Sequence, residues 1–175
     1  MSAMKLVGML PESQQETLME VGMRAMQDPH VQSLAMLPAS LALAYTPHFI
    51  KGGLILARGK TYNLDEPRQM DHDTHTLAAN SAYGALLRRC QACHQNALEG
   101  FPAFAVAVLA AKVFIDSRSG AKAAAAIARR YVIVRMLYTI AYIGGVHRGV
   151  AVARALLWSD GLRCIFNLFS QALRG

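Results

Sequence analysis

Four apolar stretches, separated by polar connections, dominate the pattern along the chain. They cover residues 34–57, 98–115, 131–146 and 150–173. Each stretch, taken with its flanks, approaches the ~20 residues that an α-helix needs to cross about 30 Å of hydrocarbon. We therefore expect an all-α protein, an integral membrane bundle of four helices.

Polar residues interrupt these stretches or their helical extensions. They are His48, Lys51, Arg89, Asn96, Glu99, Arg130, Arg135, Arg154, Asp160 and Arg163. Because a charge is costly to expose to lipid, we expect these side chains to point into the bundle or into a polar cavity. A soluble helical protein with an alanine-rich core is the alternative, but four such stretches in 175 residues leave too little polar surface to cover them.

The first 33 residues are predicted to be an amphipathic extension of a domain that covers residues 34–175. Ser13 and Glu16 have the spacing of a helix-capping box. Four apolar residues follow at helical spacing before Pro29: Leu18, Met19, Met23 and Met26. We expect this additional helix to lie on a membrane surface or on a partner protein.

Prolines and glycines predict where the main helices break and turn. Pro47 is expected to break the first helix in its middle. The second helix is expected to run from about residue 77 to residue 114, which is longer than a bilayer is thick. Turns are expected over residues 116–122 and 144–149.

The composition narrows the setting of the protein without defining its ligand. The chain is 54% hydrophobic and 17% charged, and its formal net charge is +7. That charge suits anionic lipid head groups or an anionic ligand equally well, and no nucleic acid partner is expected. Three cysteines do not form a disulfide framework, so a reducing or membrane-buried setting is favoured. The N-terminal residues lack a basic start followed by an apolar core, so no signal peptide is expected.

Two patterns suggest bound metal centres, and we expect neither to be occupied. Cys90, Cys93 and His94 form the CxxCH pattern that attaches c-type haem. The pattern lies inside a long predicted helix beside a polar network, so we expect no haem. A polar loop also contains four residues that can ligate metals: Asp71, His72, Asp73 and His75. Consecutive polar residues in a loop are mostly solvated, and no metal site is expected there.

Polar residues share one face of each of two predicted helices. On the second helix they are Arg89, Asn96 and Glu99, which together with Ala92 are spaced three or four residues apart. On the third helix they are Arg135, Tyr138 and Tyr142. A cavity between the two faces would offer guanidinium, amide, carboxylate and phenol groups within a membrane. This chemistry is typical of a site for a small zwitterionic or anionic ligand.

Four segments of the chain together form a recognisable family pattern: "RRCQACHQNALEGFPAF" (88–104), "RMLYTIAYIGG" (135–145), "LARGKTYNLDEPR" after the first helix, and "RALLWSDGL" (154–162). They resemble the MAPEG superfamily, the membrane-associated proteins of eicosanoid and glutathione metabolism. The resemblance covers residues 34–173 and leaves the N-terminal extension unexplained. It implies four-helix bundles that associate as trimers and bind glutathione between neighbouring subunits.

The resemblance also implies a role for each matching polar residue on the peptide part of glutathione. Asn96 and Glu99 would hold the peptide, and Glu99 would receive its amino group. Arg58 from the adjacent subunit would meet a carboxylate of the ligand. Arg89 belongs to the same binding set.

The remaining matching residues would surround the rest of the ligand and its sulfur. Tyr138 and Tyr142 would close the pocket, while Arg135 would anchor the network or the ligand. Arg154 matches the arginine beside the glutathione sulfur, where a guanidinium favours thiolate over thiol.

The chain departs from the family pattern at several positions. Ala92 and Gln95 stand where members of the family carry ligand-binding arginines, and Ala155 replaces a serine. The connection between Tyr142 and Arg154 is longer than in relatives, which would displace Arg154.

Two main functions follow from these matches and departures, with a c-type haem protein as a distant third. The first is a glutathione transferase or peroxidase acting on lipophilic electrophiles. The second is a non-catalytic accessory subunit of a large membrane complex built on the MAPEG scaffold. The expected oligomer is accordingly a homotrimer or a hetero-complex, in the mitochondrial inner membrane or the endoplasmic reticulum.

Overall fold

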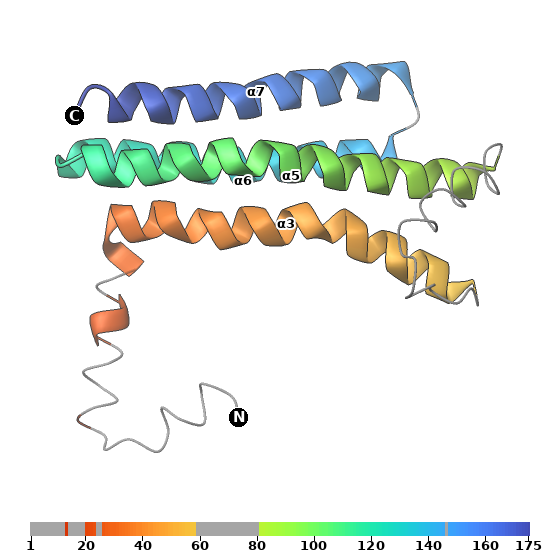
Figure 1. Cartoon of the computed structure of the whole chain (residues 1–175), viewed down its shortest axis with the longest axis horizontal. Helices are drawn as coiled ribbons and strands as arrows, with labels where there is room; N and C mark the ends of the chain where they lie inside the picture. The colour runs from red at the N-terminus through yellow and green to blue at the C-terminus, as the bar shows by residue number, and fades with distance from the viewer. Residues whose placement is uncertain (1–12, 14–19, 24–25, 59–80, 146) are drawn as a thin grey trace.

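The computed structural model describes residues 13, 20–23, 26–58, 81–145 and 147–175. Four long helices carry the described part of the chain: α3 (Pro29–Ala57), α5 (Ala82–Phe114), α6 (Arg118–Gly144) and α7 (Arg148–Ala172). They lie side by side along the long axis, with α3 and α7 on opposite sides of the α5 and α6 pair (Figure 1). The prediction of an all-α four-helix bundle is confirmed.

Helix α3 begins earlier than its apolar stretch and continues through its prolines. The Asp28 carboxylate accepts a hydrogen bond from the His30 amide at 2.8 Å and caps the helix, and Pro29 occupies the first turn. The helix then runs unbroken through Pro38 and Pro47 to Ala57. The prediction that Pro47 breaks the helix is therefore wrong. Proline removes one backbone bond, which neighbouring helices compensate inside a bundle.

Serine caps begin the next two helices. The Ser81 hydroxyl accepts from the Gly84 amide at 3.0 Å, and the Ser117 hydroxyl accepts from the Gly120 amide at 3.2 Å. Because α6 starts at Arg118, the predicted turn over residues 116–122 is wrong beyond Ser117. The run of alanines that follows has the highest helix propensity and extends the helix into a segment that is not strongly apolar.

The core joins α5, α6 and α7 through small residues and one aromatic pair. Phe104 and Tyr131 stack with ring centroids 3.9 Å apart and planes 12° apart. A Cβ at Gly100 would lie 3.4 Å from the Tyr131 hydroxyl, and a Cβ at Gly161 would lie 3.6 Å from Cδ of Arg135. Glycine at these positions lets α5 and α7 approach the large side chains of α6 closely.

Membrane-crossing character is clearest in α3 and α5. Within the described residues, these two helices are long and apolar enough to cross a membrane. Helices α6 and α7 have 27 and 25 residues, which suffices for a bilayer, but they are less apolar than α3 and α5.

The described parts of the N-terminal extension are helical at residues 20–23 and 26–27. The side chains of Val21, Met23 and Met26 are exposed there. The predicted stripe residues Leu18 and Met19 lie outside the described residues. The predicted division between residues 33 and 34 falls within α3.

Candidate functional site

Four side chains form a continuous stack where α6 leads into α7. The Arg135 guanidinium carbon lies 4.6 Å from the centroid of the Tyr138 ring, and the Tyr138 and Tyr142 centroids are 5.4 Å apart. The Arg154 guanidinium carbon lies 4.4 Å from the centroid of Tyr142. The connection between Tyr142 and Arg154 thus leaves the two side chains in contact. Whether it shifts Arg154 from the place of its counterpart in the family stays a prediction. Arginine, tyrosine, tyrosine and arginine alternate as cation–π and aromatic contacts.

Helix α5 is joined to the stack and to the end of α6 by two hydrogen bonds. Arg135 is buried and donates a hydrogen bond to the Asn96 carbonyl at 3.0 Å. Arg89 donates from Nε to the Ile143 carbonyl, at the end of α6, at 3.1 Å. The Asn96 amide bonds to its own helix, at the Ala92 carbonyl. Both arginines thus connect α5 to α6 before any ligand is considered.

Three residues predicted to point inward are exposed in the single chain: Glu99, Arg130 and Arg163. For Glu99 the reason is helical geometry, since three residues at about 100° each leave it roughly 60° around the helix from Asn96. Its carboxylate has no partner among the described residues and lies on the outer surface of α5. The inward prediction holds for the buried Lys51 and Arg135, while Arg89, Asn96 and Arg154 are half-buried.

Arg58 lies apart from the stack. Its guanidinium carbon is 4.0 Å from the centroid of Tyr83, whose hydroxyl donates to the Leu54 carbonyl at 2.9 Å. These contacts hold the end of α3 against the start of α5. The prediction that Arg58 serves a neighbouring subunit is a statement about an oligomer, and the single chain does not test it.

A second group of polar side chains lies between α3 and α5, and the sequence analysis predicts no functional role for it. Lys51 is only 3% exposed and donates to Oε1 of Gln91 at 2.6 Å. The ring of His48 lies 5.1 Å from the ring of His94. Lys51 was identifiable as a charge within an apolar stretch, but nothing in the sequence pairs it with Gln91, which lies in another helix.

The cysteines and the histidine of the CxxCH pattern are buried, and Cys93 and His94 make hydrogen bonds inside the bundle. Cys90 and Cys93 are fully buried, and the Cys93 thiol donates to the Thr139 hydroxyl at 3.8 Å. Nδ1 of His94 lies 2.8 Å from the Ala44 carbonyl oxygen. These contacts support the prediction that no haem is attached, which stays a prediction. The predicted absence of metal also stays a prediction, because the loop of residues 71–75 lies outside the described residues. Among the residues that the structure describes, no group of three histidine, cysteine, aspartate or glutamate side chains could hold a metal ion.

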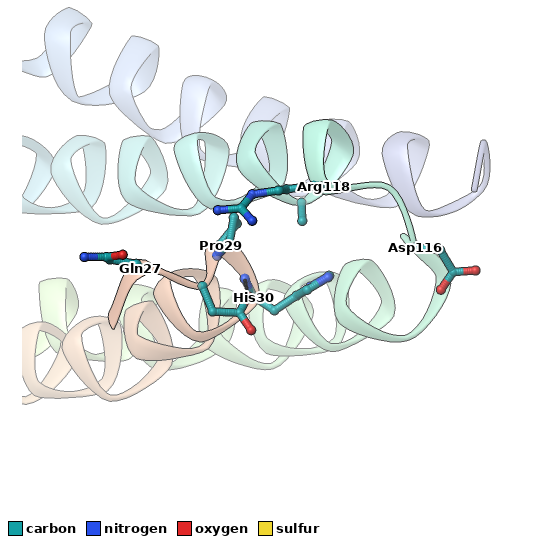
Figure 2. Close-up of a pocket in the computed structure, with 7 residues that line it drawn as sticks. Gln27, Pro29, His30, Asp116 and Arg118 are labelled. Atoms are coloured by element: carbon teal, nitrogen blue, oxygen red, sulfur yellow. Dashed lines mark hydrogen bonds between the residues drawn. The ribbon is translucent and has the colours of Figure 1, made fainter. Parts of the chain in front are cut away.

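A small hollow lies at the other end of the bundle from the stack. It has a volume of about 320 Å³ and is lined by Gln27, Asp28, Pro29, His30, Asp116, Arg118 and Ala121. Figure 2 shows the Arg118 side chain extending towards Pro29, while the Asp116 carboxylate points away. The hollow shares no residue with the predicted ligand site.

One comparison with known proteins identifies a family. The model of the MAPEG family matches residues 33–174, which is most of the chain. No curated protein and no solved structure matches it.

Proposed function

The chain belongs to the MAPEG family, and from this premise we propose that it binds glutathione between subunits and activates the thiol towards lipophilic electrophiles. Such a protein acts as a glutathione transferase or peroxidase within a membrane. The substrate would enter from the bilayer, where a lipophilic electrophile accumulates. Glutathione would enter from water.

The observation that carries this proposal is the placement of Arg154 on Tyr142. A neutral aromatic ring holds the guanidinium without cancelling its charge. No carboxylate among the described residues pairs with Arg154. Its charge is therefore available to an anion, and a guanidinium beside a thiol favours the thiolate. The thiol proton passes to solvent, and the sulfur forms a bond to the electrophilic carbon as the leaving group departs.

The remaining polar residues suit the peptide part of glutathione. The Glu99 carboxylate is exposed on the outer face of α5, where a ligand held between two copies would meet it. We assign it the amino group of glutathione, with Asn96 and Arg89 beside it. Arg58 of the adjacent copy would bind a ligand carboxylate, for which it must leave its contact with Tyr83.

The test uses the absorbance of a thiolate in the near ultraviolet. Adding glutathione to the detergent-solubilised oligomer at neutral pH should produce a new difference band. Arg154→Ala should abolish the band and retain part of the binding, because the peptide contacts remain. Glu99→Gln should weaken binding itself by about ten-fold or more, since it removes a charge-assisted contact.

Arg148→Ala is the matched control, because Arg148 is an exposed arginine at the start of the same helix. It should leave both binding and the band unchanged. Absence of both signals in the wild-type oligomer at millimolar glutathione would refute the proposal. A band that survives Arg154→Ala would refute the role of Arg154 alone.

A second candidate function is that of a non-catalytic accessory subunit of a larger membrane complex. Exposed apolar side chains in the N-terminal extension favour it: Val21, Met23 and Met26. Methionine suits adaptable protein contacts. Under this alternative the stack would serve only to hold α5, α6 and α7 together.

A further inference from the structure

Three charged residues form an ion cluster on the outer surface where α6 meets α7. Asp160 accepts bonds from Arg130 at 3.0 Å and from Arg163 at 2.7 Å. The two arginine side chains are 55% and 61% exposed, whereas that of Asp160 is 22% exposed. Both guanidinium groups therefore keep donors free on the outward side of the cluster, which carries one net positive charge.

The cluster lies at the middle of the bundle rather than at an end. Asp160 is halfway along α7, roughly 18 Å from either end at about 1.5 Å per residue. Tyr131, next to Arg130, stacks on Phe104, and Gly161, next to Asp160, packs against the same tyrosine. Phe104 belongs to the uncharged section of α5 over residues 100–111. The cluster therefore lies at the depth of the hydrocarbon core, beyond the helix ends from which arginine reaches the interface.

Apolar side chains surround the cluster on the same two helices. Ile133 follows Arg130 by one turn, Leu156 precedes Asp160 by one turn, and Phe166 follows Arg163 by one turn. All three are more than half exposed. An apolar surface with a positive centre matches neither water nor lipid tails, since a charge at this depth costs several kcal/mol unless it is paired. It does match another membrane-spanning helix.

We propose that this surface docks a membrane-spanning helix of another polypeptide, and that this helix carries a carboxylate side chain at mid-depth. The carboxylate would accept the free donors of Arg130 and Arg163 and neutralise the cluster. A head-group anion does not reach this depth. The contact would bury the exposed apolar residues around the cluster as well.

A second copy of this chain is the other occupant to consider. The four described helices carry two carboxylates, Asp160 within the cluster and Glu99 on α5. Glu99 lies at a similar depth, but it belongs to the glutathione site, so this exclusion of a second copy rests on the proposed function. A foreign helix supplies the missing charge without removing Glu99 from that site.

The experiment uses the single tryptophan of the chain as its probe. Trp158 is partly exposed, two residues from Asp160. The full-length protein is reconstituted in zwitterionic vesicles with a synthetic leucine–alanine helix that carries one central glutamate and a fluorescence acceptor. We expect quenching of Trp158 at about ten-fold lower peptide density than with the matched glutamine peptide. Arg163→Glu should abolish this preference for glutamate. A peptide with a central lysine should then quench Trp158 of this variant at lower density than the glutamine peptide does.

Two further variants keep the result interpretable. Arg163→Gln, which perturbs folding less, should remove most of the preference for glutamate. Arg174→Glu, at the exposed end of the chain, should leave it unchanged. Equal quenching by the glutamate and glutamine peptides, or a preference that survives both Arg163 variants, would overturn the proposal.

The same vesicles separate this proposal from its alternatives. Energy transfer between labelled copies of the protein without peptide, lost in Arg163→Gln, would identify a second copy as the occupant and overturn the proposal of a foreign helix. The glutathione difference band should be the same in wild type and Arg163→Gln, because the cluster lies outside the stack. Loss of the band in the wild type would refute the proposed function and leave the peptide preference standing.

Discussion

Replacing Arg135 tests whether the buried contacts between α5 and α6 stabilise the fold apart from any ligand. Arg135→Ala removes the 3.0 Å bond to the Asn96 carbonyl and the contact 4.6 Å above Tyr138. A hydrogen bond from a charged donor contributes about 1.5–3 kcal/mol, and a cation–π contact about 0.5–2 kcal/mol. We therefore expect the free energy of unfolding to fall by about 2–5 kcal/mol.

The assay is unfolding of the detergent-solubilised protein in increasing fractions of sodium dodecyl sulfate, followed by helical circular dichroism. Arg129→Ala is the matched control, since this exposed arginine of the same helix bonds to Gln32 across the surface. Arg129→Ala should lower the free energy of unfolding by less than about 1 kcal/mol. The loss for Arg135→Lys should lie between those of Arg129→Ala and Arg135→Ala, because lysine keeps the charge but lacks the planar guanidinium. Equal losses for Arg135→Ala and Arg129→Ala would refute the reasoning.

Three further predictions concern other parts of the molecule. Gln91→Leu removes the 2.6 Å acceptor of buried Lys51 and should destabilise the protein by about 1–3 kcal/mol, whereas adding Lys51→Met should recover most of the loss, as measured by the same unfolding assay. Because Cys90 and Cys93 are packed inside the bundle, the purified protein should carry no covalent haem; a Soret band that survives acid-acetone extraction would contradict this. If the protein is an accessory subunit, deleting residues 1–28 should release it from a large complex in gentle detergent, and a homotrimer unaffected by the deletion would count against that function.

The helices could be predicted from the sequence because their length and apolar content are local properties. The start of α6 could not be placed by apolar content, since its first half is an alanine-rich segment with several charges. There the Ser117 cap and helix propensity determine the boundary. The prediction of a break at Pro47 failed for the opposite reason, because a strong local signal was outweighed by the packing of α3 on α5 and α6.

The candidate site was predictable in membership and only partly in geometry. Family resemblance named Arg135, Tyr138, Tyr142 and Arg154, and the structure brings these four together. Spacing alone could not show that Asn96 uses its carbonyl rather than its side chain towards Arg135. Such a contact depends on how two helices are rotated against each other, which no single helical pattern contains.

The outward charges agree with our proposals that the chain functions in an assembly. Periodicity assigns polar residues to one face of a helix, and the cost of exposing charge to lipid then led us to expect every charge inside the bundle. Glu99 and the two arginines of the ion cluster, Arg130 and Arg163, are exposed instead, near the middle of their helices. These positions are compatible with the cost of exposing charge to lipid if other polypeptides or a ligand cover the charges in an assembly. A neighbouring copy with glutathione would cover Glu99, and a carboxylate-bearing helix would cover the cluster.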